Sequence, residues 1–156
     1  MSHPYAETLS GSPIVRCAPG ARHERICARL HQHVQASLAN LASARLLAPR
    51  SEVRPSAECA LRPDLSLITA ATGKLWLAAE IVDSVDHRPD TVIKKQIYEE
   101  LRLPRLWIID PRYDNVEVYH ATQHGMVLKG ILAGRDVLTE KLLPEFKVAI
   151  AELFAA

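Results

Sequence analysis

The segment Leu75-Trp76-Leu77-Ala78-Ala79-Glu80-Ile81-Val82 is apolar at every position except one. A run of this kind is typical of a strand that is buried on both faces of a sheet. Glu80 is the exception, and a lone buried carboxylate is strongly unfavourable unless it is paired, protonated or bound to a metal ion. The segment therefore predicts a central strand in which Glu80 has a partner.

Asp64 is the candidate partner, because residues 61–69 and 74–82 predict two strands joined by a tight turn. Gly73 suits the left-handed position that closes a three-residue hairpin loop. Counting back from that loop places Asp64 opposite Glu80, with Cβ atoms roughly 5 Å apart on one face. Two carboxylates this close repel each other unless a proton or a cation lies between them. A hard divalent ion fits, since it prefers oxygen ligands.

Two other interpretations remain open for this carboxylate pair. Asp64 follows Pro63, and an aspartate in that position is often a turn or capping residue. Glu80 would face solvent if the register were shifted by one residue.

The next predicted helix, residues 90–102, carries a polar stripe. Asp90, Lys94 and Tyr98 recur every four residues and share one face, while Lys95 lies on the neighbouring face. A helix that follows the Glu80 strand and packs back on the sheet can bring the Lys94 ammonium over the carboxylates. The alternative is a solvent-exposed Asp90–Lys94 pair.

The remaining periodicity predicts an α/β domain of the α+β type, with a mixed sheet flanked by helices. We expect one domain over residues 1–156, with residues 1–20 forming an N-terminal arm. The expected helices are 21–41 and 147–154, and the expected strands are 13–17, 46–54, 106–110, 116–120 and 126–132.

Composition limits the possible functions. The formal charge of +1 excludes a uniformly basic nucleic-acid binder, so any such contact needs a local patch. The three cysteines have no C-x-x-C spacing, which indicates a reducing, cytoplasmic protein. Neither a signal peptide nor a membrane span is expected, and no contact with membranes.

Five motifs follow one another along the chain: Arg62-Pro63-Asp64, Glu80-Ile81-Val82-Asp83-Ser84, Asp90-x-x-x-Lys94-x-x-x-Tyr98, Leu106-Trp107-Ile108-Ile109-Asp110-Pro111 and Val116-Glu117-Val118-Tyr119. In this order they resemble the Uma-two family, a family classed as restriction endonucleases within the PD-(D/E)XK nuclease superfamily. The resemblance covers nearly the whole chain and implies a restriction-endonuclease-like mixed sheet flanked by helices.

The resemblance also implies site residues. Asp64 and Glu80 would hold Mg²⁺ or Mn²⁺, and the ion would activate water for phosphodiester hydrolysis. The superfamily lysine usually stands two residues after the glutamate, where this chain has Val82, and Lys94 would replace it with support from Tyr98. Ser84 matches the family serine after the glutamate and would orient a ligand.

One departure concerns an acid near the N-terminus. The family often has a glutamate directly after the early glycine, whereas Gly11 is followed by Ser12. Glu24, at the start of the first helix, is the candidate replacement.

Two hypotheses follow for function. The first is a Mg²⁺-dependent DNA endonuclease in which Asp64, Glu80 and Lys94 are catalytic and which acts as a homodimer. The second is a catalytically inactive domain of the same fold that binds nucleic acid or a protein partner.

Overall fold

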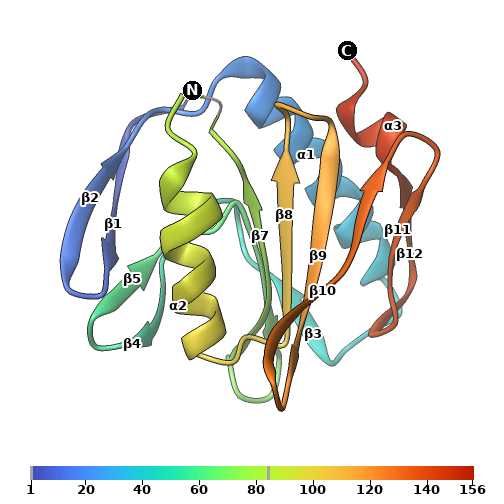
Figure 1. Cartoon of the computed structure of the whole chain (residues 1–156). Coiled ribbons are helices and arrows are strands. Elements are labelled where there is room, and N and C mark those ends of the chain that lie inside the picture. Colours follow the sequence, from blue (N-terminus) through green and yellow to red (C-terminus); the bar gives the residue numbers. More distant parts are fainter. Residues whose placement is uncertain (1, 84) are drawn as a thin grey trace.

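The computed structural model describes residues 2–83 and 85–156 and has a mixed α+β architecture, as the sequence predicts (Figure 1). Its elements are β1 (Tyr5–Leu9), β2 (Ser12–Arg16), α1 (Ala21–Ser37), β3 (Ala44–Leu46), β4 (Val53–Ser56), β5 (Cys59–Leu61), β6 (Leu65–Thr69), β7 (Leu75–Ile81), the π-helical turn η1 (Pro89–Ile93), α2 (Lys94–Glu100), β8 (Arg105–Asp110), β9 (Asn115–Thr122), β10 (Gly125–Ala133), β11 (Val137–Glu140), β12 (Leu143–Ala149) and α3 (Ile150–Phe154). In the described part of the chain, no helix is long and apolar enough to cross a membrane.

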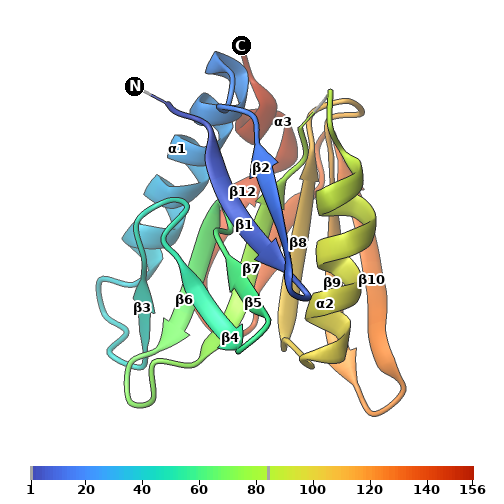
Figure 2. The ribbon, with the colours of Figure 1, turned by 90° about the vertical axis from the view of Figure 1, so that its left-hand side faces the viewer.

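The main sheet has six strands in the order β10-β9-β8-β7-β6-β3. Strands β7 and β8 are parallel and are connected through η1 and α2, whereas the other neighbours are antiparallel. Helix α1 covers one face of this sheet and α2 covers the other (Figures 1 and 2). A parallel pair needs a crossover connection, and the crossover places α2 beside the end of the Glu80 strand.

Strands β6 and β7 pair antiparallel, which confirms the predicted hairpin. The loop is one residue longer than predicted, because the Thr69 amide already donates to the Lys74 carbonyl. A β-bulge then adds Trp76 to β7 and restores the predicted register. The two differences cancel, so Asp64, one residue before β6, lies beside Glu80.

The N-terminal residues form a hairpin, whereas the sequence pattern suggested a single strand within an irregular arm. Ser10 and Gly11 both have positive φ, as a two-residue turn requires, and β1 pairs with β2 across it. Strand β1 also pairs with β5, which gives a four-stranded sheet in the order β2-β1-β5-β4. This small sheet lies beside α2 (Figure 2).

Several predicted boundaries are wrong for local reasons. The strand expected over 61–69 is broken at Pro63, which has no amide hydrogen to donate, so β5 ends before it and β6 begins after it. The strand expected over 46–54 is replaced by β3 and β4 on either side of Pro49. The helix expected over 147–154 begins only at Ile150, because the preceding residues pair with β11. Helix α1 ends at Ser37 and not at residue 41.

Candidate active site

Glu80 lies at the end of β7 and is 2% exposed. Its carboxylate contacts two side chains of α2. The Lys94 ammonium lies 2.5 Å from Glu80 Oε2, and the Tyr98 hydroxyl donates to the same oxygen over 2.5 Å. Lys94 is 0% exposed, while Lys95 turns away and lies over the Tyr119 ring. The four-residue spacing of Lys94 and Tyr98 therefore does place both side chains on Glu80.

A second carboxylate, that of Glu7 on β1, completes the surroundings of Lys94. The ammonium donates to Glu7 Oε2 over 2.7 Å. Arg16 on β2 bridges Glu7 and Asp90, at 2.6 and 2.8 Å. Glu7 and Arg16 are not among the site residues that the sequence predicts. A Ser-Gly turn flanked by residues able to form strands was the available signal, because it would have placed both side chains in one hairpin.

Asp64 is held by different groups. Its Oδ2 accepts a hydrogen bond from the Ile81 amide over 2.8 Å, and its Oδ1 lies 2.9 Å from both His23 Nε2 and Arg50 Nη1. Glu24 binds Arg50 over 2.6 Å and so acts on Asp64 only through that guanidinium. Glu24 therefore does not contact the carboxylate pair, and the buried acid near the N-terminus is Glu7. The contacts of His23 and Arg50 with Asp64 are likewise not predicted from the sequence.

The two proposed metal ligands differ in their electrostatics. Burial alone would raise the pKa of Asp64, but the hydrogen bond and charge of His23, together with the Ile81 amide, lower it below its usual value. Burial raises the pKa of Glu80 to about 8, because neighbouring carboxylates add to the burial and Lys94 only partly offsets both. Burial would lower the pKa of Lys94, but these carboxylates raise it.

Buried carboxylates outnumber buried cations in this region, which we call the ionic cluster. Its acids are Glu7, Asp64, Glu80 and Asp90, and its cations are Arg16, Lys94, the partly exposed Arg50 and, when protonated, His23. The carboxylate oxygens match the ligand preference of a hard divalent ion. Within residues 2–83 and 85–156, however, no three His, Cys, Asp or Glu side chains are arranged as a ready-made metal site.

The donor set fits such an ion by atom type. An ion held by Asp64 and Glu80 would replace Arg50 and His23 as the positive charge beside Asp64. Ser84, which the family resemblance predicts to orient a ligand, lies outside the described residues.

A cavity of about 290 Å³ opens beside Asp64 at the start of α1. His23, Val82, Asp83 and Pro111 are among the residues that line it. His23 thus lies between this cavity and the Asp64 carboxylate. The Asp64 end of the ionic cluster is close to solvent, although its carboxylate is buried.

Comparison with known proteins agrees with the sequence motifs. No curated protein matches this sequence. A solved structure from Anabaena variabilis, described as "a putative nuclease belonging to DUF820", superposes with a TM-score of 0.80 at 17% identity, covering 97% of this chain and 90% of the other. At this identity the superposition establishes a shared fold. Residues 3–151 match the family Uma2 (the Uma-two family), described as "Putative restriction endonuclease". The chain belongs to the Uma2 family.

Proposed function

We propose that the protein is a Mg²⁺-dependent DNA endonuclease in which Mn²⁺ can replace Mg²⁺. The observation that supports this best is the convergence of Asp64, Glu80 and Lys94, from three separate segments, in one buried cluster rich in carboxylates. Burying such a cluster is costly for stability, so it indicates a role in function. Membership of a family described as restriction endonucleases makes phosphodiester hydrolysis the proposed reaction.

Each residue has a distinct proposed role. Asp64 and Glu80 hold the divalent ion, which when bound supplies Lewis-acid chemistry that activates water and neutralises phosphate charge. Lys94 donates a hydrogen bond to a phosphate oxygen as negative charge develops there. Tyr98 keeps the Glu80 carboxylate in place through its 2.5 Å hydrogen bond.

Two further residues act from outside the carboxylate pair. Glu24 orients Arg50 and thereby Asp64. For Ser84, the family motif supports a role in orienting a bound ligand.

The test is a cleavage assay on DNA with Mg²⁺, Mn²⁺ or chelator. We expect Asp64→Asn and Glu80→Gln to abolish both cutting and binding of the divalent ion, measured by calorimetry, because the amide removes the charge that holds the ion. Lys94→Ala should slow cutting by about 10²–10³-fold while ion binding remains. Lys95→Ala, on the neighbouring face of the same helix, is the matched control and should cut normally.

One observation favours the inactive-domain alternative. The oxygens of Asp64 already accept hydrogen bonds from Arg50 and the Ile81 amide, so the cluster is closed without an ion. A wild-type protein that folds but neither binds a divalent ion nor cuts DNA would refute the nuclease proposal and favour the alternative of an inactive domain that binds nucleic acid or a protein. Cutting that persists in Glu80→Gln would place the active site elsewhere.

We also propose a homodimer, since two symmetric sites cut both strands most simply. The exposed apolar side chains of the edge strand β10, Val127, Leu128 and Ile131, support self-association. Light scattering at micromolar concentration tests this, and a monomer would refute it. The three free cysteines support a reducing compartment such as the cytoplasm.

A further inference from the structure

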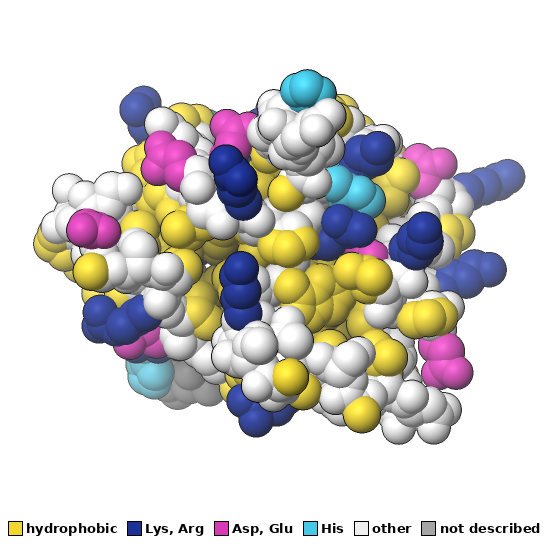
Figure 3. Space-filling model, turned by 90° about the horizontal axis from the view of Figure 1, so that it is seen from below, with side chains coloured by type: hydrophobic (Ala, Val, Ile, Leu, Met, Phe, Trp, Pro, Cys, Tyr) yellow, Lys and Arg dark blue, Asp and Glu magenta, His cyan; other side chains and the backbone are white. Residues whose placement is uncertain are grey.

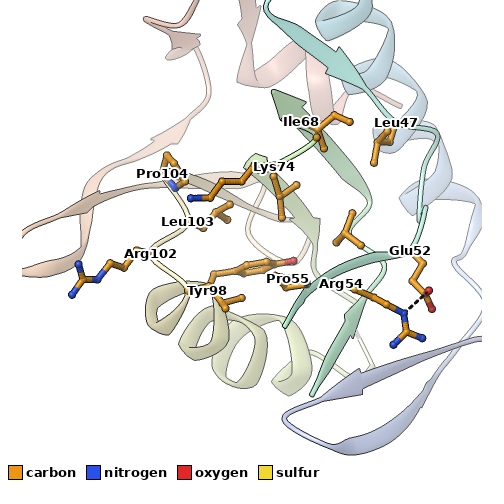
Figure 4. Close-up of a pocket in the computed structure, with 14 residues that line it drawn as sticks. Leu47, Glu52, Arg54, Pro55, Ile68, Lys74, Tyr98, Arg102, Leu103 and Pro104 are labelled. Atoms are coloured by element: carbon orange, nitrogen blue, oxygen red, sulfur yellow. Dashed lines mark hydrogen bonds and ion pairs between the residues drawn. The ribbon is translucent and has the colours of Figure 1, made fainter. Parts of the chain in front are cut away.

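A larger cavity lies at the opposite end of the β6–β7 hairpin from Asp64. Its volume is about 480 Å³, within the range of roughly 300–1,000 Å³ that is usual for small-ligand sites. It is bounded by β4, by the turn between β6 and β7, and by the end of α2 with the residues that follow (Figure 4). None of the proposed metal ligands lines it.

This cavity is connected to the ionic cluster along one face of the sheet. The side chain of Tyr98 lines the cavity, and its hydroxyl donates to Glu80. Along β6 and the residue before it, every second side chain points to the same face of the sheet, so Asp64, Ser66 and Ile68 share one face. Ile68 lines the cavity. The Ser66 hydroxyl is buried and has no partner among the described residues. Tyr98 therefore links the wall of the cavity to the proposed metal ligand Glu80.

The lining of the cavity combines apolar walls with a basic rim. Its walls include Leu47, Val53, Pro55, Leu75, Leu103 and Pro104. The rim carries the exposed side chains of Arg54, Lys74 and Arg102, whereas the one acid, Glu52, is paired with Arg54 at 3.0 Å. Seen from below, apolar side chains gather in the middle of the molecule with lysine and arginine side chains around them (Figure 3). This lining complements a ligand that has a flat, largely apolar part and a negative charge.

We propose that this cavity is a nucleotide subsite that takes one unstacked nucleotide from a single-stranded segment of the substrate. The inference rests on the proposed nuclease function and narrows its substrate class. The base packs against the apolar walls, behind which Tyr98 is fully buried, and the flanking phosphates contact the basic rim. A base that is paired and stacked in a duplex has both faces covered, so it cannot enter. The protein therefore prefers nucleic acid with unpaired nucleotides.

The test measures binding in chelator, where no metal-dependent cutting occurs. Fluorescence anisotropy compares four probes: a single-stranded DNA of about twelve nucleotides, its duplex, an equally long strand without bases, and deoxyadenosine monophosphate as competitor. We expect the single strand to bind about tenfold more tightly than the duplex or the base-free strand. The mononucleotide should compete weakly, because it lacks the second flanking phosphate.

Two variants assign the binding to this cavity. Val53→Trp fills it from β4 and should weaken single-strand binding about tenfold. Lys74→Gln, an exposed position that does not affect folding, should weaken it about threefold and reduce its salt dependence. The matched controls lie away from both the cavity and β10: Val137→Trp on β11 and Lys147→Gln on β12 should bind as the wild type does.

The outcomes separate the subsite from the nuclease proposal. Equal binding of single strand and duplex, no loss when the bases are removed, or equal affinity of the cavity variants and their controls would each overturn the subsite. So would binding of the mononucleotide without binding of the strand. Cavity-dependent binding of single strands by a protein that cuts no DNA in Mg²⁺ would support the subsite and refute the nuclease proposal.

Discussion

The two faces of the main sheet differ in the kinds of side chain that they bury. The face under α1 is packed with apolar side chains, including Trp107, which stacks on Phe146 with ring centroids 5.3 Å apart. The face under α2 also has apolar residues, but at its upper end it buries Glu80, Lys94 and their ionic partners. Both faces exclude water. On the first face the buried acid Glu140 has the partly exposed Arg105 as its partner, whereas the second face buries a whole network of charges, and that network is the reason to propose a function for it.

The contrast predicts different responses to similar substitutions. An apolar core tolerates changes that preserve volume, because dispersion contacts are not directional. A buried ion pair does not, because removal of one charge leaves the other without a partner in a medium of low polarity. The following predictions test this difference, beginning with the largest effect.

Replacement of Lys94 by methionine should destabilise the fold by about 3–5 kcal/mol, because it leaves Glu80 without its cation and Glu7 with Arg16 alone. Urea denaturation at neutral pH measures this. The double variant Lys94→Met with Glu80→Gln should recover part of the loss. A single variant as stable as the wild type would show that the two faces do not differ in this way.

Asp64→Asn should cost about 1–3 kcal/mol, because the amide cannot accept from Arg50, His23 and the Ile81 amide as a carboxylate does. Glu80→Gln should cost less, since the surroundings of Glu80 disfavour its charge. The two amide variants, compared by thermal unfolding without metal ions, therefore differ in stability. A larger loss in Glu80→Gln would contradict the assignment of the two environments.

On the apolar face, Leu67→Met is the counterpart of Lys94→Met. Leu67 is fully buried in the core under α1. The change conserves volume and should cost less than about 1.5 kcal/mol. Urea denaturation of both variants under the same conditions gives the direct comparison, and equal losses would argue against it.

An ion pair near solvent should contribute least. Arg112 binds Asp110 at the end of β8, with an N–O distance of 2.8 Å. Burial alone would raise the pKa of Asp110, but the hydrogen bonds from Arg112 lower it below its ordinary 3.8. Its stabilising contribution is therefore present above that pH and lost as the pH falls below it. Arg112→Gln should cost less than about 1 kcal/mol at pH 7, measured by urea denaturation, with a smaller difference at pH 3.

Much of the fold could be predicted from local signals. Gly73 has the positive φ expected of it, and the apolar run of β7 lies at the centre of the sheet, as the pattern indicates. The register that brings Asp64 beside Glu80 is correct although the loop length is not, because the bulge at Trp76 compensates. Because nearly every residue of β7 is apolar, a bulge does not change the hydrophobic pattern of the strand, and its position could not be predicted.

The site was predictable only where its spacing is local. Lys94 and Tyr98 share a helical face, so their joint approach to Glu80 follows from periodicity. Glu7 and Arg50 reach the cluster from distant segments that have no periodic relation to it. Contacts of this type depend on how the sheets pack against each other, and a single sequence contains no direct signal of that packing.

The position of Glu7 has a consequence for how the chain reaches its native state. The contact between Glu7 and Lys94 joins residues 87 positions apart, and that between Arg16 and Asp90 joins residues 74 apart. Loops of this length are entropically costly to close, so such contacts form late in folding. The β1–β2 hairpin is made early in synthesis, yet it cannot complete its ion pairs until α2 has formed. Before then the carboxylates of the cluster remain hydrated, and the docking of this hairpin is the step that dehydrates them.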